Sequence, residues 1–267
     1  MPEIDVNGQQ LHYTDSGGEG PVVVFCHSFG MDGSMFEPQC AEFAGDYRCI
    51  TWDERAHGSS RTDRQFDFWD SARDVLALLD ALQVDRAALV GTSQGGFLAL
   101  RAAMLAPQRL AALAVLGSSA AAEEPGQKVA FEQLHDAFVG GPEGPPEQVL
   151  EAMAGICFGD RFDARPWKAR WREWPAAQFT FAFRALADRD DIVERLPEVQ
   201  APVLVLHGAD DRSYAPSFGA AICAGVARCE GFVEVEGGAH FLSITDPEPV
   251  NSALRPFLAT HLSGGSA

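Results

Sequence analysis

The chain has 267 residues, of which 46% are hydrophobic and 22% are charged, which argues against a disordered chain and favours one globular catalytic unit. Its 38 acidic and 20 basic residues give a formal net charge of −18, so we expect neither nucleic acid nor an anionic membrane surface as a partner. No apolar stretch has the length of a membrane span, and residues 1–5 lack the basic start and apolar core of a signal peptide. We therefore expect a cytoplasmic protein.

Six cysteines are scattered along the chain: Cys26, Cys40, Cys49, Cys157, Cys223 and Cys229. No C-x-x-C pair or other spacing typical of a metal site occurs among them. For a chain that stays in the cytoplasm we expect reduced thiols, with no disulfide, no bound metal and no cofactor. The sequence leaves homo-oligomer formation open.

The first part of the chain predicts strands that alternate with helices. Residues 3–26 predict two short strands and then a third, continuously apolar strand, as in a sheet covered on both faces. A glycine-bearing loop at residues 27–33 follows, at the strand end where ligands gather in open α/β sheets. Residues 47–53 predict the next strand, and residues 69–82 keep their apolar side chains on one helical face.

The clearest pattern surrounds Ser93. Residues 87–90 form an apolar run that predicts a buried strand, residues 94–105 have the composition of a helix, and residues 110–116 predict another strand. Residues 91–95 read Gly-Thr-Ser-Gln-Gly, which fits the nucleophile elbow G-x-S-x-G, a tight turn that lifts the serine hydroxyl above the sheet. Because the flanking strand and helix supply the required context, we favour a nucleophilic serine over a structural turn.

The middle of the chain, residues 120–196, lacks this alternation and is rich in aromatic residues. We predict a helical cap inserted into a core formed by residues 1–119 and 197–267. Trp167 and Trp171 keep helical spacing, which fits a packed apolar face and a substrate wall equally well.

Alternation resumes after the insertion, where residues 201–208 and 232–235 predict two more strands. Asp211 comes shortly after the first of them and His240 follows the second through a glycine-containing loop. A serine hydroxyl is a poor nucleophile unless a base takes its proton and an acid orients that base. We therefore predict that Ser93, His240 and Asp211 form a catalytic triad.

The chain order Ser93, Asp211, His240 resembles that of the α/β-hydrolases. Within that superfamily, residues 26–36 and 74–82 are similar to the 3-oxoadipate enol-lactone hydrolase and bacterial carboxylesterase branch, with cofactor-free haloperoxidases (perhydrolases) as close neighbours. The resemblance implies an α/β-hydrolase fold, with a mostly parallel eight-stranded sheet, helices on both faces and a helical cap insertion. It also selects Asp211 as the acid, with the adjacent Asp210 as the alternative.

The same resemblance implies an oxyanion hole made by the backbone N–H groups of Phe29 and Gln94. Two turns depart from the family pattern. His27-Ser28 stands where many relatives have His-Gly, although the enol-lactone branch tolerates Ser there, and residues 55–58 read Arg-Ala-His-Gly instead of Arg-Gly-His-Gly. Neither change touches the triad. We expect His27 and His57 to bond nearby backbone.

The function implied is that of a serine hydrolase that cleaves a small-molecule ester or lactone through an acyl-enzyme. A cofactor-free perhydrolase and a slow-hydrolysing, ligand-sensing signalling protein are the alternatives. Candidate substrate contacts are Trp167, Trp171 and Phe241. Enol-lactone substrates carry a carboxylate, which could meet basic residues of the insertion unless these are ordinary solvated charges: Arg165, Lys168, Arg170, Arg172 and Arg184. The carboxylates of residues 63–80 are expected on a solvated helix face.

Overall fold

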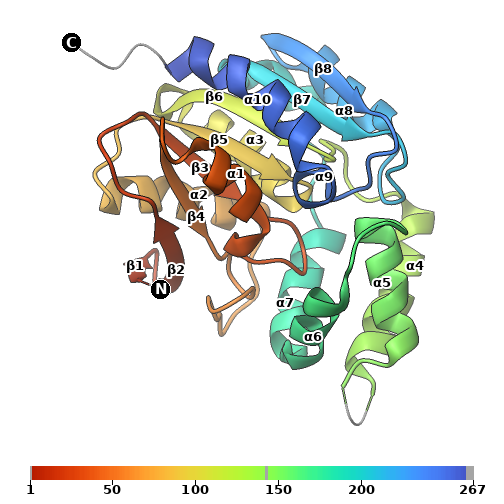
Figure 1. The fold of residues 1–267 in the computed structure, drawn as a ribbon. Coiled ribbons are helices and arrows are strands. Elements are labelled where there is room, and N and C mark those ends of the chain that lie inside the picture. The colour runs from red at the N-terminus through yellow and green to blue at the C-terminus, as the bar shows by residue number, and fades with distance from the viewer. Residues whose placement is uncertain (1, 142–143, 263–267) are drawn as a thin grey trace.

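The computed structural model describes residues 2–141 and 144–262. Its centre is one sheet with the strand order β1-β2-β4-β3-β5-β6-β7-β8 (Figure 1). The strands are β1 (Glu3–Val6), β2 (Gln9–Asp15), β3 (Val22–Cys26), β4 (Arg48–Trp52), β5 (Ala87–Thr92), β6 (Leu110–Leu116), β7 (Val203–Gly208) and β8 (Cys229–Val235). The pairs β1–β2 and β2–β4 are antiparallel, and the other five pairs are parallel. The predicted eight-stranded, mostly parallel sheet is confirmed.

Helices cover both faces of this sheet (Figure 1). The helices among the described residues are α1 (Glu37–Phe43), α2 (Phe68–Ala81), α3 (Gln94–Leu105), α4 (Pro125–Val139), α5 (Glu147–Phe158), α6 (Arg165–Glu173), α7 (Ala176–Ala187), α8 (Pro216–Gly225), α9 (Leu242–Thr245) and α10 (Pro247–Leu262). Successive strand residues point to opposite faces. In β3, Val23 and Phe25 therefore belong to the core on the side of α1 and α10, whereas Val22 and Val24 belong to the core on the side of α2, α3 and α8.

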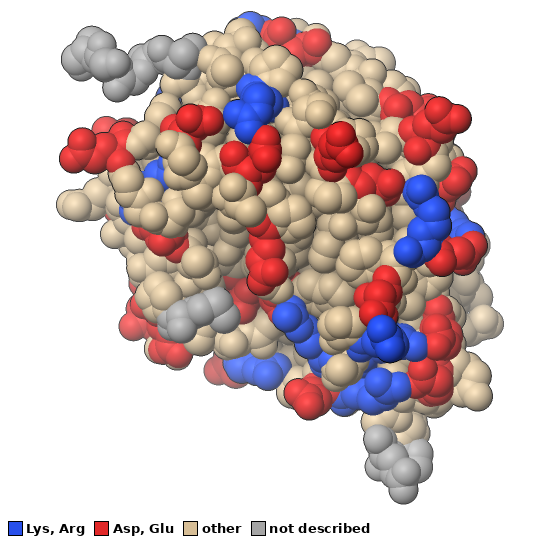
Figure 2. Space-filling model, in the orientation of Figure 1, with Lys and Arg blue, Asp and Glu red and all other residues tan. Residues whose placement is uncertain are grey.

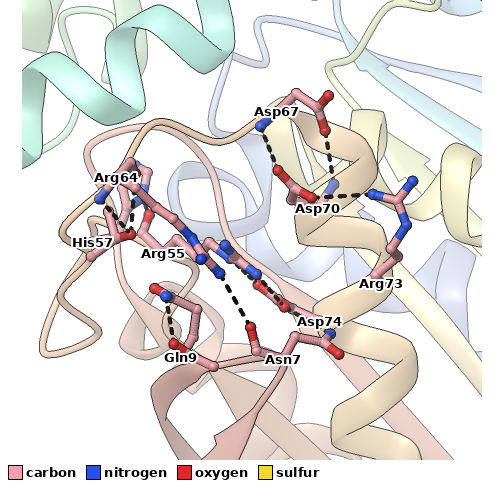
Figure 3. Close-up of polar contacts among 11 residues, drawn as sticks. Asn7, Gln9, Arg55, His57, Arg64, Asp67, Asp70, Arg73 and Asp74 are labelled. Carbon is pink, nitrogen blue, oxygen red and sulfur yellow. Dashed lines mark hydrogen bonds and ion pairs between the residues drawn. The ribbon is translucent and has the colours of Figure 1, made fainter.

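Helix α2 begins with a reciprocal cap. The Asp67 carboxylate accepts a hydrogen bond from Asp70 N at 2.9 Å, and the Asp70 carboxylate accepts one from Asp67 N at 3.3 Å (Figure 3). Arg73 extends the cap through an ion pair with Asp70 at 3.1 Å. The two hydrogen bonds of the cap satisfy backbone N–H groups that the start of a helix leaves unpaired.

One carboxylate of α2 contradicts the expectation of a solvated face. Asp74 is fully buried and pairs with the buried Arg55, whose Nη2 donates to Asp74 Oδ1 at 2.8 Å, while Asn7 Nδ2 donates to the same oxygen at 3.0 Å (Figure 3). The expectation failed because helical spacing shows which side a residue lies on, but not which loop packs there. The pair fastens the loop after β4, which carries Arg55, to α2.

The helices α4 to α7 lie between β6 and β7 in the chain and pack together at one end of the molecule (Figure 1). The two ends of this segment are tied to each other. Ile192 N donates to Ala120 O at 2.9 Å, and Arg189 forms a 2.6 Å ion pair with Glu123, both side chains being 2% exposed. The division of the chain into a core and a cap at residues 120 and 196 stays a prediction.

The expectation of no disulfide was wrong. Cys223 in α8 and Cys229 at the start of β8 are bonded, with their Cα atoms 5.2 Å apart. The expectation was based on cellular compartment, whereas the short connection from α8 to β8 brings the two thiols together. Among the described residues, no helix is long and apolar enough to cross a membrane, and no cluster of three His, Cys, Asp or Glu side chains could hold a metal ion.

Candidate active site

Ser93 occupies the turn between β5 and α3 in a backbone conformation that side chains rarely adopt, with φ 51° and ψ −111°. Glycine is required on both sides of it. A Cβ atom at Gly95 would lie 1.9 Å from Cys26 O, and one at Gly91 would lie 2.3 Å from the backbone of Gly95. The local sequence therefore dictates the tight turn, and the turn positions Ser93 at the carboxyl end of the sheet.

The structure brings all three residues of the predicted triad together. His240 Nε2 lies 2.9 Å from Ser93 Oγ, and His240 Nδ1 lies 2.8 Å from Asp211 Oδ2. The alternative acid, Asp210, is exposed, and its backbone N–H donates to Gly238 O at 2.9 Å. The carboxylate that contacts the imidazole is therefore that of Asp211.

The electrostatics of Asp211 keep it ionised. Burial alone would raise its pKa, but the neighbouring His240, the His207 ring and the Tyr214 N–H together hold the pKa well below its usual range. The Tyr214 N–H donates to Asp211 Oδ1 at 2.9 Å, and the His207 ring lies 3.2 Å from Oδ2. An ionised Asp211 fixes the imidazole of His240 with its Nε2 directed at Ser93.

The loop that carries Phe29 lies against the elbow, since a Cβ atom at Gly95 would also lie 2.9 Å from His27 O. His27 holds this loop in place. Its Nδ1 contacts Ser28 O at 2.8 Å and its Nε2 accepts from Glu54 N at 2.8 Å, while burial lowers its pKa and keeps the ring neutral. His57 similarly contacts Arg55 O at 2.9 Å. The expected backbone-bonding role of both histidines is confirmed.

Ser93 and His240 open into a cavity of about 60 Å³. Its lining is Ser28, Phe29, Ser93, Phe131, Leu134, His135, Met153, Ile156, Cys157, Phe179, Phe183, Leu186, Ser213, Tyr214, His240 and Phe241. Most of these side chains are apolar, and the set contains no Lys, Arg, Asp or Glu. Phe241 is among the lining residues. Phe179 and Phe183 on α7 also line the cavity, and their four-residue spacing, which puts them on one face of a helix, is the sequence signal for this part of the lining.

Trp167 and Trp171 do not reach this cavity. They line a separate one of about 500 Å³, and the Trp171 indole Nε1 donates to Gly30 O at 2.6 Å. Trp171 is 1% exposed, so it belongs to the packed face of α6 rather than to a wall beside Ser93. Of the two explanations that helical spacing allowed, the structure favours packing.

The basic residues of the insertion are neutralised locally. Figure 2 shows basic side chains gathered over the inserted helices, with acidic ones beside them and across the rest of this face. The ion pairs are Arg165–Asp163, Lys168–Glu147, Lys168–Glu151, Arg170–Asp32, Arg172–Glu147 and Arg184–Glu132. Each cation considered as a partner for a substrate carboxylate already has a carboxylate of its own.

The sequence of this chain is similar to those of known hydrolases and related enzymes. The family model described as alpha/beta hydrolase fold matches residues 21–247. The chain is 30% identical over 249 residues to 3-oxoadipate enol-lactonase 1 of Acinetobacter baylyi, covering 90% of either chain. It is 28% identical over 258 residues to a Mycobacterium tuberculosis protein provisionally named non-heme bromoperoxidase BpoC, covering 92% of this chain and 97% of the other.

Among solved structures, a thermophilic esterase from Thermogutta terrifontis is similar with a TM-score of 0.86 and 25% identity, covering 98% of this chain and 100% of the other. The resemblance to the enol-lactone hydrolase and carboxylesterase branch is confirmed, and these relatives support hydrolase activity of the carboxylic-ester type. The family match and the 30% identity over nine-tenths of the chain show that this protein belongs to the alpha/beta hydrolase fold family.

Proposed function

We propose that this protein is a serine hydrolase that cleaves a neutral carboxylic ester or lactone of small to medium size through an acyl-enzyme. The observation that supports it most is the continuous hydrogen-bonded chain Asp211–His240–Ser93, with contacts of 2.8 and 2.9 Å. At those distances the imidazole could take the hydroxyl proton and the carboxylate could orient the imidazole, as a serine nucleophile requires, which supports the proposal.

In the first half of the reaction, His240 Nε2 takes the proton of Ser93 as the serine oxygen attacks the carbonyl carbon of the substrate. Asp211 stays ionised and stabilises the imidazolium that forms. The imidazolium then protonates the leaving alcohol, or the ring oxygen of a lactone. Water attacks the resulting acyl-enzyme by the same route and regenerates Ser93.

The negative oxygen of each tetrahedral intermediate would be held by the N–H groups of Phe29 and Gln94. Gln94 is the first residue of α3, so its N–H is one of the donors that a helix leaves without an internal partner, at the positive end of the helix dipole. A donor of this kind lowers the barrier by about 3 kcal/mol.

A neutral substrate follows from the lining of the cavity. No charged side chain is among the lining residues described above, and the basic residues of the insertion are paired with carboxylates. An anionic substrate would also approach against a net charge of −18. The cavity of about 60 Å³ is small beside the roughly 300–1,000 Å³ of ligand pockets, so short acyl groups suit this arrangement best.

The central test is the Ser93→Ala variant. We expect it to lose all measurable hydrolysis of p-nitrophenyl acetate while its circular dichroism and melting temperature stay close to those of the wild type. Ser60→Ala is the matched control, because it removes another buried hydroxyl, one that lines neither cavity and accepts from His12 N at 2.9 Å. Hydrolysis that survives in Ser93→Ala would end the proposal.

A substrate panel tests the chemistry more finely. We expect p-nitrophenyl acetate and butyrate to be cleaved faster than the octanoate, and uncharged lactones faster than lactones that carry a carboxylate. Because one relative is named as a bromoperoxidase, the panel also includes an assay for peracid formation from acetate and hydrogen peroxide. Peracid formation that exceeds ester hydrolysis would replace the esterase proposal with a perhydrolase.

A further inference from the structure

The hydroxyl of Ser28 is a buried polar group that has no role in the proposed mechanism. The residue is 0% exposed and lines the cavity that holds Ser93 and His240. Its Oγ atom has no hydrogen-bond partner among the residues that the structure describes. Since buried hydroxyls almost always have a partner, an unpartnered hydroxyl on a residue that lines a candidate active site points to a bound ligand as its partner.

The backbone around Ser28 is held on both sides. Its carbonyl oxygen lies 3.1 Å from the Met31 N–H and 2.8 Å from His27 Nδ1, and His27 is fixed in turn by the Glu54 N–H at 2.8 Å. These bonds hold the residue but leave its hydroxyl unused. A hydroxyl on an anchored backbone is the kind of preorganised donor that stabilises charge without reorganisation during the reaction.

Ser28 immediately precedes Phe29, whose N–H is one of the two proposed oxyanion-hole donors. The end of β3 packs directly on the elbow at Gly95, which brings the loop of Ser28 beside Gln94, the other proposed donor. Ser28 therefore lies in the loop that neighbours both N–H groups.

We propose that Ser28 is a third oxyanion-hole donor: its hydroxyl hydrogen-bonds the substrate oxygen that becomes negatively charged as Ser93 attacks. This inference rests on the proposed function. Such a bond strengthens as charge develops on that oxygen, so it stabilises the transition state more than the bound substrate. The same oxygen becomes negative in acylation and in deacylation, and the hydroxyl therefore serves both steps.

The test compares Ser28→Ala and Ser28→Gly with the wild type and with the Ser60→Ala control, using p-nitrophenyl acetate. We expect kcat to fall roughly 10- to 100-fold in both Ser28 variants, with KM changed by no more than about twofold. An equal loss in the two variants assigns the effect to the missing hydroxyl, because alanine and glycine differ in volume. The melting temperature of each variant verifies the fold.

Inhibition by a short-chain trifluoromethyl ketone is the second measurement, because Ser93 would add to its carbonyl and create a stable oxyanion. We expect its inhibition constant to rise by the same factor as kcat/KM falls. We also expect the fractional loss of kcat to be equal for an activated aryl ester and an alkyl ester, since a donor to the oxyanion is indifferent to the leaving group.

Three outcomes would overturn the proposal: a kcat in Ser28→Ala within about twofold of the wild type, a loss confined to KM, or a loss confined to the alkyl ester. A folded Ser28 variant with unchanged ketone inhibition would do the same. These results differ from failure of the proposed function, which would appear as a wild type without esterase activity or as activity that survives Ser93→Ala.

Discussion

At the scale of single residues, two buried carboxyl groups near the site have pKa values that are shifted in opposite directions. Asp211 has compensating partners, which hold its pKa well below the ordinary range. Glu54 is fully buried, and burial raises its pKa to about 8 even though contacts with Gln94 and Ser71 oppose the change. One carboxyl group therefore stays charged beside the imidazole, while the other holds its proton at neutral pH.

The first residue-scale prediction concerns the pH profile of hydrolysis. The pKa of Asp211 is held well below its ordinary range, so this carboxylate is charged at every pH at which the enzyme would be assayed. We expect Asp211→Asn, which cannot carry that charge, to lose most of its kcat for p-nitrophenyl acetate across the whole of that range, in buffers of constant ionic strength. A loss confined to one end of the range would contradict a permanently ionised Asp211.

The second concerns Glu54 and stability. The folded protein keeps a proton on Glu54 that the unfolded chain releases above pH 4.5, so the free energy of unfolding should fall as pH rises from about 4.5 to about 8. The predicted loss is on the order of 5 kcal/mol. We expect urea unfolding of Glu54→Gln to show a smaller decline than the wild type between pH 5 and 9. Parallel curves for the two proteins would contradict this.

At the scale of elements, the disulfide joins the end of α8 to the beginning of β8, whereas His240 follows the opposite end of β8. Removing it should therefore affect stability and spare activity. For so short a loop, we expect the double variant Cys223→Ser/Cys229→Ser to lose about 2 kcal/mol in urea unfolding, with kcat unchanged. Dithiothreitol should shift the wild type to the same midpoint and leave the variant unaffected; equal sensitivity of both would argue against the bond.

Much of the element-scale picture was predictable. Continuous apolar runs indicated the parallel strands, because a strand covered on both faces has no polar side, and the glycines around Ser93 indicated the elbow. The prediction failed where distant segments meet. The burial of Asp74 depends on Arg55, and the place of Trp171 depends on Gly30, neither of which periodicity along one helix can reveal. Which residues of α4, α5 and α7 line the cavity depends on how those helices pack against the rest of the molecule, which the sequence of each helix alone does not determine.

At the scale of the whole molecule, charge is the dominant feature. Most of the basic side chains are already in ion pairs. The remaining carboxylates, which give the net charge of −18, repel one another across the surface. Exposed ion pairs contribute about 0–1 kcal/mol each and weaken in salt, whereas screening of the net repulsion stabilises the fold.

The repulsion should be the larger of these two effects. We expect the melting temperature to rise by several degrees between 10 mM and about 0.5 M sodium chloride. A melting temperature that falls with added salt would show that the surface ion pairs outweigh the repulsion.

The two bonds that tie residues 120–123 to residues 189–192 have a consequence for how this protein can change over time. Whatever lies between these points departs from the sheet and returns to it at nearly the same place. Lengthening, shortening or exchanging that stretch costs little closure entropy and leaves the strands undisturbed. The catalytic residues on the sheet can therefore stay the same during evolution while substitutions and length changes in these helices alter which substrates reach them.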